Sequence, residues 1–291
     1  MTTLGTVFLP QLPPERLRDV VRAADAAGLE ELWLWEDCFL EGGLTTAAAA
    51  LAYTERLRVG VGLLPVPLRN VALSAMEIAT LVRLFPGRAV IAAGHGVQDW
   101  MGQVGARVAS PLTLLREYTT ALRALLRGER VSTEGRYVRL DGVALDWPPP
   151  APVPILLGAT GDRTLRLSGE VGDGTVLTGG TDPAAVRRAL TLVGEGRTAA
   201  GRTGPHEVVV YLHAATGPTA AERIAAERAR WGYADPSKDV SVAGDEHAVA
   251  DAVHRWAEAG ATSVVLQPTA DDPDPEGFVR FVAERVRPLV G

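Results

Sequence analysis

The sequence predicts an α/β fold, a (β/α)₈ TIM barrel, and three observations support this prediction. Apolar segments of about five residues alternate with amphipathic segments of about 10 to 17 residues, which is the pattern of βα units around a parallel sheet. Eight such apolar segments occur, and eight strands joined by crossover helices favour a closed barrel over an open sheet. The chain has 291 residues, a length that one barrel can fill, so we expect a single domain over residues 1–291.

The expected strands are the apolar segments, in chain order. They cover residues 5–9, 31–35, 57–63, 88–93, 155–157, 175–178, 208–214 and 263–267. Two helices can be predicted in detail, because apolar residues recur at i, i+3, i+4 and i+7. These residues are Leu17, Val20, Val21 and Ala24 in the first helix and Val249, Ala252, Val253 and Trp256 in the later one. Gly28 and Gly260 are the expected helix stops, and Asp245 is the expected N-cap of the later helix.

The alternation of strands and helices is interrupted between the fourth and fifth strands. A long helix is expected over 112–126, and β-prone residues on both sides of Glu134-Gly135 predict a β-hairpin with its turn there. A proline run over 148–152 then stiffens the return to the fifth strand. We therefore expect an insertion, a helix plus a β-hairpin, over approximately residues 97–153.

Composition argues against several classes of protein. The chain is 47% hydrophobic and 22% charged, which is enough apolar mass for a large buried core. The net charge of −6 without a basic block argues against a nucleic-acid partner. No apolar segment reaches the roughly 18 to 20 residues of a membrane span, and the amino end lacks a signal pattern, so we expect a cytoplasmic protein with no membrane partner. One cysteine, Cys38, excludes an internal disulfide, and no histidine spacing favours a metal site.

Chemistry in a parallel barrel gathers where the strands end, so the residues after each strand are the candidates. The second strand ends in Glu36 and Asp37. His95 follows the fourth strand between two glycines, where an imidazole can reach a ligand, although a lone histidine can equally be structural. The small-residue loop 158–162 runs into an expected helix at 163–169, and free N–H groups at a helix N-terminus suit a phosphate. The alternative is a tight turn that Thr160 or Asp162 caps.

Aromatic and histidine side chains leave further alternatives open. Trp33 and Trp35 alternate with leucines and share one face of their strand, either for core packing or for stacking on a planar ligand. We interpret the remaining histidines as structural. They are His206, His213, His247 and His254.

Several segments together resemble the luciferase-like flavin-dependent oxidoreductase family, and most closely its branch that uses the deazaflavin coenzyme F420. The segments are "AGLEELWLWEDCF", "LRVGVGLLPVPLRNVALSAMEIATL", "FPGRAVIAAGHG", "GRYVRLDGVALDWPPP" and "PVPILLGATGDRTLRLSGEVGDGTVLTG". They occur in order over roughly residues 5–180, with a looser match to Gln267. The resemblance implies a (β/α)₈ barrel with an insertion, a homodimer, and a coenzyme bound across the carboxyl ends of the strands.

The resemblance also implies roles for individual residues. A cis peptide at Gly62-Leu63 would form a bulge behind the coenzyme ring, and Glu36 would contact the polar edge of the ring. Asp37 stands where many relatives hold a catalytic histidine, so Asp37 or His95 would handle the substrate proton. The resemblance assigns coenzyme contacts to two loops, with the phosphate on the second: Gly94 and Gly96; and Gly158, Ala159, Thr160, Gly161 and Asp162.

The function implied is hydride transfer between coenzyme F420 and a small organic substrate. Val97 stands where sugar-phosphate-oxidising relatives place a glutamate, so we do not expect activity on glucose 6-phosphate. One alternative keeps the fold and binds FMN, as a monooxygenase. Another is a non-redox barrel isomerase or aldolase, although a Schiff-base aldolase is disfavoured because the single lysine, Lys238, lies outside the strands. The last alternative is a non-catalytic coenzyme-binding barrel.

Overall fold

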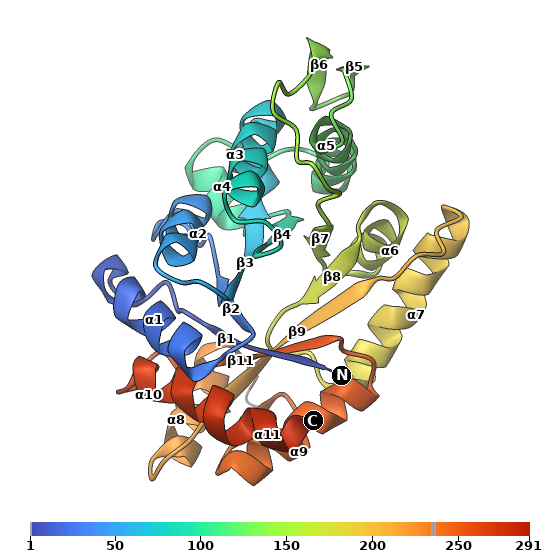
Figure 1. Cartoon of the computed structure of the whole chain (residues 1–291). Helices are drawn as coiled ribbons and strands as arrows, with labels where there is room; N and C mark the ends of the chain where they lie inside the picture. Colours follow the sequence, from blue (N-terminus) through green and yellow to red (C-terminus); the bar gives the residue numbers. More distant parts are fainter. Residues whose placement is uncertain (1, 234, 236) are drawn as a thin grey trace.

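Eight parallel strands close into a barrel in the computed structural model, which describes residues 2–233, 235 and 237–291 (Figure 1). The eight strands around the barrel, in order, are β1 (Thr3–Val7), β2 (Glu31–Leu34), β3 (Arg58–Pro65), β4 (Ala89–Gly94), β7 (Ile155–Gly158), β8 (Gly174–Leu177), β9 (Glu207–Ala215) and β11 (Ser263–Gln267). β11 pairs with both β9 and β1, so the sheet closes on itself. The predicted fold class and all eight predicted strands are confirmed, and β1 begins and ends two residues earlier than expected.

Helices surround the barrel and bury their apolar faces against it (Figure 1). They are η1 (Pro14–Arg16), α1 (Leu17–Ala27), α2 (Gly43–Ala52), η2 (Val66–Leu68), α3 (Val71–Leu84), α6 (Asp162–Val171), α7 (Pro183–Ala199), α8 (Ala220–Arg230), α9 (Glu246–Glu258), α10 (Pro275–Arg280), the π-helical turn η3 (Phe281–Val286) and α11 (Arg287–Val290). The buried residues of α1 and α9 include all eight residues predicted from periodicity. Gly28 ends α1 with φ +79°, and Asp245 caps α9 by accepting a hydrogen bond from the Ala248 N–H, as predicted.

A second core fills the barrel itself. Trp33 and Trp35 point into it, whereas Leu32 and Leu34 face the helices, so the predicted alternation is confirmed. Trp33 is fully buried and fits there because two strand neighbours are glycines: a Cβ on Gly60 would lie 2.4 Å from its ring and a Cβ on Gly62 would lie 2.8 Å from it. The Trp33 Nε1–H donates to the Glu31 carboxylate at 3.1 Å, which satisfies the polar atom of this large side chain.

The segment between β4 and β7 contains two helices and a hairpin. These are α4 (Gln98–Gln103), α5 (Pro111–Leu126) and the antiparallel strands β5 (Val131–Glu134) and β6 (Arg139–Val143), which lie at the end of the molecule farthest from α9 and α11 in Figure 1. The expected turn at Glu134-Gly135 is wrong in detail, because Glu134 pairs with Arg139 and the turn covers residues 135–138. A hydrogen bond of 2.9 Å from the Gly135 N–H to the Val138 carbonyl closes that turn.

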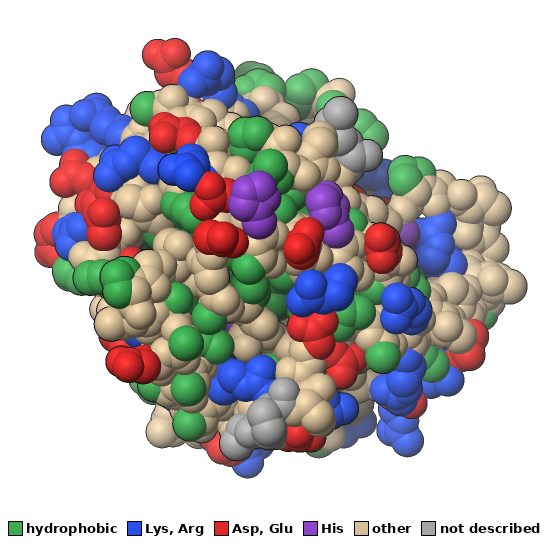
Figure 2. All heavy atoms as spheres, turned by 90° about the horizontal axis from the view of Figure 1, so that it is seen from below, with side chains coloured by type: hydrophobic (Ala, Val, Ile, Leu, Met, Phe, Trp, Pro, Cys, Tyr) green, Lys and Arg blue, Asp and Glu red, His purple; other side chains and the backbone are tan. Residues whose placement is uncertain are grey.

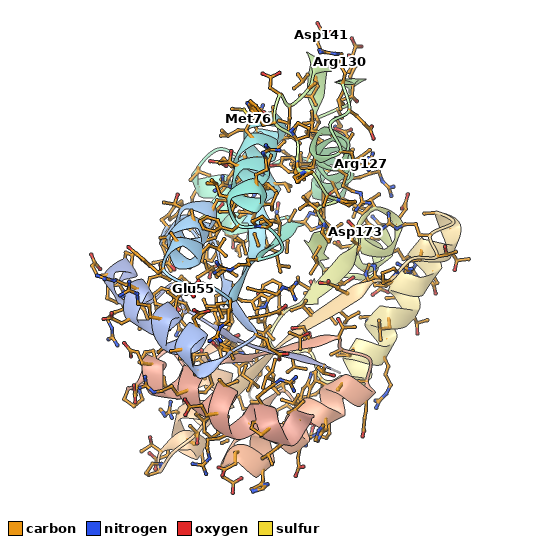
Figure 3. All side chains as sticks on the ribbon, viewed as in Figure 1. Glu55, Met76, Arg127, Arg130, Asp141 and Asp173 are labelled. Carbon is orange, nitrogen blue, oxygen red and sulfur yellow. The ribbon has the colours of Figure 1, made fainter. Side chains whose placement is uncertain are left out.

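Asp173, labelled in Figure 3, joins several elements at the amino ends of β7 and β8. Its carboxylate accepts the Ile155 N–H at 3.0 Å and pairs with Arg123 of α5 and with Arg202. Burial alone would raise the pKa of Asp173, but the Ile155 hydrogen bond and the two arginines lower it. On the face seen in Figure 2, acidic and basic side chains are interspersed. In the described part of the chain, no helix has both the length and the apolar character needed to cross a membrane.

Candidate functional site

A cavity of about 410 Å³ opens at the carboxyl ends of the strands. This volume lies within the range of about 300 to 1,000 Å³ that is usual for small-molecule and cofactor sites. The lining residues come from seven of the eight barrel strands and the segments after them: Trp35, Glu36, Asp37, Gly62, Leu63, Pro65, His95, Gly96, Val97, Trp100, Gly158, Ala159, Thr160, Thr164, Thr178, Gly179, Tyr211, His213, Trp231, Tyr233 and Gln267. This cavity therefore lies at the carboxyl-end position expected for the site.

Nine of the twelve residues predicted for the site line this cavity. They are Glu36, Asp37, Gly62, Leu63, His95, Gly96, Gly158, Ala159 and Thr160. The remaining three, Gly94, Gly161 and Asp162, lie beside it rather than in its wall. Gly94 is buried under Leu63, Gly161 is the N-cap of α6, and Asp162 pairs with Arg188 at 2.5 Å.

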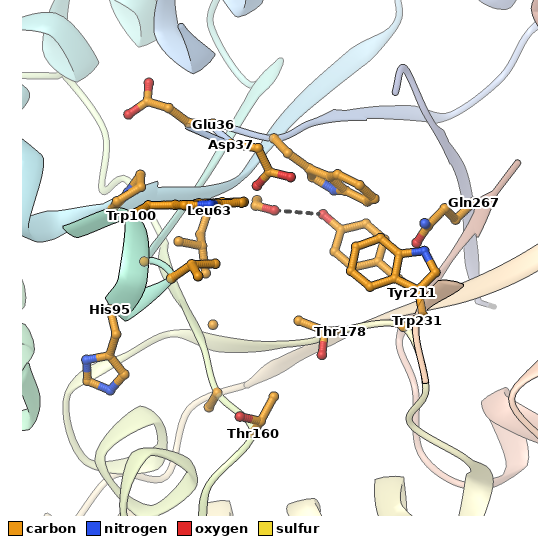
Figure 4. Close-up of a pocket in the computed structure, with 18 of the residues that line it drawn as sticks. Glu36, Asp37, Leu63, His95, Trp100, Thr160, Thr178, Tyr211, Trp231 and Gln267 are labelled. Carbon is orange, nitrogen blue, oxygen red and sulfur yellow. Dashed lines mark hydrogen bonds between the residues drawn. The ribbon is translucent and has the colours of Figure 1, made fainter. Parts of the chain in front are cut away.

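The two acids after β2 have different surroundings. Both carboxylate oxygens of Glu36 are engaged, because Arg69 donates to them at 2.9 and 2.5 Å and the Gly43 N–H donates at 2.8 Å. In Figure 4 the Glu36 carboxylate points away from that of Asp37, which projects toward the centre of the cavity. Burial raises the pKa of Asp37 above its ordinary value. Asp37 is therefore an acid held in a poorly solvated place, whereas Glu36 is half of an ion pair.

A third carboxyl group belongs to the same loop. Leu40 N–H donates to the Asp37 carbonyl at 2.9 Å, and this turn brings Glu41 near Asp37. Burial, together with the charge of Asp37, raises the pKa of Glu41 to about 7. The sequence analysis did not single out Glu41, because only the folded turn brings it under the influence of Asp37.

The third strand forms a bulge at the cavity wall. The Gly62–Leu63 peptide is cis, as the resemblance implied, and the pairing of β3 with β4 shifts register between Val61 and Leu64. The Tyr211 hydroxyl donates to the Gly62 carbonyl at 3.3 Å (Figure 4). A Cβ on Gly158 would lie 2.2 Å from Leu63 Cδ2, and one on Gly94 would lie 2.5 Å from it. These two glycines therefore make room for Leu63, which presents an apolar surface to the cavity.

His95 lies toward α6. Its Nε2 atom is 3.1 Å from the hydroxyl of Thr164, and Figure 4 shows the ring well apart from Asp37. Burial lowers the pKa of His95, and the backbone of Pro111 partly opposes this shift. The imidazole is therefore largely neutral near pH 7, on the side of the cavity formed by the α6 loop.

The loop between β7 and α6 leaves a helix N-terminus without a side-chain cap. The N-cap residue is Gly161, and no described side chain accepts a hydrogen bond from the first turn of α6. The alternative in which Thr160 or Asp162 caps this helix is therefore wrong. Nothing lies within 4 Å of the position where a Gly161 side chain would begin. N–H groups in this arrangement can bind an anion such as a phosphate.

Several lining residues were missed by the sequence analysis. Tyr211 and His213 extend the inward-facing alternation of β9, so the period of two in that strand could have identified them. His213 is 2% exposed, and this burial is the main reason why the pKa of its imidazole is lowered to about 4. It lines the cavity, although the sequence analysis had interpreted it as structural. Trp231 and Tyr233 follow α8, where no periodic pattern points to the barrel mouth.

Comparisons with known proteins agree with the sequence resemblance. The family model described as luciferase-like monooxygenase matches residues 3–270. A 5,10-methylenetetrahydromethanopterin reductase of Methanolobus tindarius is 30% identical over 212 residues, which are 73% of this chain and 64% of the relative. An F420-dependent glucose-6-phosphate dehydrogenase of Nakamurella multipartita is 30% identical over 187 residues, which are 60% of this chain and 55% of the relative. The chain thus matches between half and two thirds of the length of these relatives.

The fold is shared with solved structures. An F420-dependent secondary alcohol dehydrogenase in complex with an F420-acetone adduct superimposes with a TM-score of 0.88. The alignment covers 100% of this chain and 99% of that one, at 20% sequence identity.

Proposed function

This chain belongs to the luciferase-like monooxygenase family, and on that premise we propose that it is a coenzyme F420-dependent oxidoreductase that moves a hydride between the deazaflavin and a small organic substrate. The observation that carries the proposal is the cavity at the barrel mouth, which extends from an apolar wall at Leu63 to Thr160 and Thr164, beside the uncapped N-terminus of α6. The names of relatives that use F420 support the same coenzyme.

The residues at the mouth fit such a coenzyme. Leu63 and Trp35 offer apolar surface to a flat ring, and the N–H groups at the start of α6 suit its phosphate. Gly96, with φ +66°, lets the chain turn closely along the cavity. When bound, the coenzyme supplies the hydride chemistry, while the protein orients the reactants and excludes water.

Asp37 is the residue that we assign to the substrate proton. Its carboxyl group projects into the cavity, and the raised pKa brings it nearer to the operating pH, as a general acid or base requires. His95 lies on the α6 side, so we assign it to the coenzyme side of the cavity. Glu36 acts indirectly in this proposal, because its pairing with Arg69 holds the end of β2 in place.

Binding of the two candidate coenzymes to the purified protein tests the proposal. F420 and FMN are titrated separately while intrinsic tryptophan fluorescence is followed, because Trp35, Trp100 and Trp231 line the cavity. We expect saturable quenching by F420 at lower concentrations than by FMN. Reduced F420 should then be oxidised in the presence of a panel of small carbonyl compounds. Tight binding of FMN with none of F420 would overturn the proposal.

An FMN-dependent monooxygenase is the second candidate, because the matching family model is described as a luciferase-like monooxygenase. A Schiff-base aldolase has less support than either. Lys238 is the single lysine of the chain and is absent from the cavity wall; it lies 3.7 Å from Asp182. The FMN titration described above separates the monooxygenase from the leading proposal.

A further inference from the structure

The cavity has two chemically different ends. His95 and Thr160 lie at the end formed by the β4 and β7 loops, and Trp231 and Gln267 lie at the opposite end (Figure 4). We call the second the aromatic end and define it by Tyr211, His213, Trp231, Tyr233 and Gln267. Since a coenzyme phosphate is assigned to the first end, the aromatic end is left for the substrate.

The rings of the aromatic end are held in place by their polar atoms. The Tyr233 hydroxyl donates to the Gly179 carbonyl at 2.7 Å, and the Trp231 Nε1–H donates to Glu227 at 2.7 Å. The His213 ring centroid lies 6.0 Å from that of each of these two rings. A hydrogen-bonded polar edge leaves mainly the apolar ring surface for a ligand.

Close packing fixes Tyr233 further. Gly180 has φ +85°, and a Cβ there would lie 2.4 Å from the Tyr233 ring. Similarly, a Cβ on Gly179 would lie 2.7 Å from the Nε2 of His213. At both positions after β8, only glycine leaves room for the rings of the aromatic end. The surface that faces the substrate is shaped by packing rather than by mobile side chains.

Charge is scarce around this space. No Lys or Arg occurs among the described residues that line the cavity. Glu36 is paired with Arg69, and His213 is neutral near pH 7 because its pKa is lowered to about 4. An anionic substrate would find no cation here and would face the carboxyl group of Asp37. Burying such a charge without a partner is strongly unfavourable.

A few neutral polar groups remain. Gln267 is 2% exposed and lines the cavity next to His213 of the paired strand β9, and Thr178 lines the same cavity. Buried amide, imidazole and hydroxyl groups can each form hydrogen bonds with a carbonyl or hydroxyl group. A mostly apolar cavity with a small number of such groups orients a neutral ligand without requiring a charge.

We propose that the substrate of this site is a largely apolar carbonyl compound without a negative charge, or the corresponding alcohol, whose ring or branched chain packs on Trp231 and Tyr233. This inference rests on the proposed function and adds the substrate class. In the reducing direction the carbonyl carbon gains a hydride and its oxygen gains the proton held by Asp37, while the reduced coenzyme is oxidised by two electrons. Sugar phosphates and carboxylic acids are excluded from the class.

Three aldehydes that differ in charge test the class. Benzaldehyde, 4-carboxybenzaldehyde and 4-(trimethylammonio)benzaldehyde are titrated by calorimetry into the protein alone and into the protein loaded with F420. We expect benzaldehyde to bind at least tenfold more tightly than 4-carboxybenzaldehyde in both series. The cationic probe, whose charge aromatic faces can accept, should also bind more tightly than 4-carboxybenzaldehyde. With reduced F420, benzaldehyde should be turned over faster than 4-carboxybenzaldehyde.

Variants show whether the aromatic end carries the preference. Trp231→Ala should weaken benzaldehyde binding about tenfold, and Trp231→Phe should restore most of it, since aromatic stacking contributes about this much. Trp147→Ala is the matched control, because Trp147 is 73% exposed and outside the cavity. Gln267→Arg places a cation at the aromatic end and should shift the preference toward 4-carboxybenzaldehyde by about tenfold.

The outcomes separate the substrate class from the coenzyme. Binding of 4-carboxybenzaldehyde that equals or exceeds that of benzaldehyde, or no binding of benzaldehyde, overturns the substrate class whether or not F420 binds. Failure of F420 to bind, with the charge preference intact in the protein alone, overturns the proposed function and leaves the substrate class standing.

Discussion

Asp37 is the residue in the site whose chemistry depends most on its surroundings. Glu36, directly before it, is neutralised by Arg69, whereas the pKa of Asp37 is raised by burial and no described cation opposes this. Two adjacent acids in the sequence thus differ in their partners and in their direction. The sequence predicted that both belong to the barrel mouth, but Arg69, which lies between η2 and α3, decides which of them is free.

Replacing Asp37 by Asn should separate proton transfer from coenzyme binding. Because an amide cannot exchange the proton, we expect the rate of hydride transfer to fall about a hundredfold or more. The dissociation constant of F420, measured by fluorescence, should change less than about threefold, since Asp37 is not assigned to the phosphate. His95→Ala should have the opposite profile, with weaker F420 binding. A full rate in Asp37→Asn would remove this residue from the mechanism.

Glu41 should make the stability of the protein depend on pH. Its pKa is about 7 in the folded state, against 4.5 as the ordinary value, so the folded state binds more protons between these pH values. Unfolding free energy should therefore fall as pH rises from about 5 to 8. Glu41→Gln removes this loss. It should stabilise the protein by ~1 to 2 kcal/mol at pH 8, after allowance for partial solvent exposure, and by little at pH 5.

Urea denaturation of both proteins at the two pH values measures this effect. Glu55→Gln is a suitable control, because Glu55, labelled in Figure 3, is exposed and precedes the amino end of β3, whereas the cavity lies at the carboxyl ends of the strands. An equal stability change at pH 5 and pH 8 would show that Glu41 does not titrate in this range.

At the scale of elements, one ion pair joins β2 to the segment before α3. Arg69 forms ion pairs with both Glu36 and Glu77. The side chains of Arg69 and Glu36 are only 16% and 11% exposed. Arg69→Met should destabilise the fold by about 3 kcal/mol, because it leaves a carboxylate poorly solvated and without a partner. The double variant Arg69→Met with Glu36→Gln should recover a large part of that loss.

Thermal and urea unfolding of the two variants give the coupling between the residues. If the double variant is no more stable than Arg69→Met alone, the loss comes from packing of the arginine and not from the stranded charge.

The N-terminus of α6 should respond to a new cap in opposite ways for stability and binding. Gly161→Asp can accept hydrogen bonds from the first turn without backbone strain, because Gly161 has φ −87° and ψ 149°. It should stabilise the protein by about 0.5 to 1 kcal/mol. It should also weaken F420 binding about tenfold, because a carboxylate then occupies the proposed phosphate site.

Thr219→Asp makes the same kind of change at the N-terminus of α8, where Thr219 forms no side-chain cap. It should alter stability without altering F420 binding. If Gly161→Asp binds F420 with unchanged affinity, the coenzyme phosphate does not bind at the N-terminus of α6.

The elements themselves were largely predictable, and the exceptions have physical causes. Each barrel strand is a short apolar run, and α1 and α9 have the spacing of a half-buried helix. β10 (Ser241–Ala243) pairs in parallel with the end of β9. It was missed because a strand of three residues is too short to show a periodic pattern. The hairpin turn was placed too early, because the backbone N–H groups of Arg136 and Tyr137 donate to the carboxylate of the distant Glu117.

At the scale of the whole molecule, chain order predicted the position of the site but not its shape. Residues that follow successive strands must meet at one mouth, so loops 36–37, 94–96 and 158–162 could be grouped in advance. The aromatic end could not, because Trp231 and Tyr233 reach the cavity from the segment after α8. Its form depends on how that segment packs on Gly179 and Gly180, and no short-range pattern contains this information.

The outer face of α3 has several exposed apolar side chains. Leu73, Met76 and Leu84 share one side of the helix and are 47%, 57% and 67% exposed, and Met76 is labelled on that helix in Figure 3. Exposed apolar side chains gathered on one face are typical of a protein interface, and the family resemblance implies a homodimer. We propose that a second copy covers this face.

Met76→Glu places a charge in the proposed interface and should weaken self-association at least about a hundredfold, which converts the dimer into monomers at micromolar concentration. Size-exclusion chromatography with light scattering measures the mass. Leu289→Glu is the matched control, because Leu289 is 38% exposed on the distant α11 and should leave the mass unchanged. A wild-type protein that is monomeric, or a Met76→Glu variant that stays dimeric, would rule out this face. Since α3 begins two residues after Arg69, which anchors Glu36, a dimer formed here would also support the end of β2 from outside the barrel.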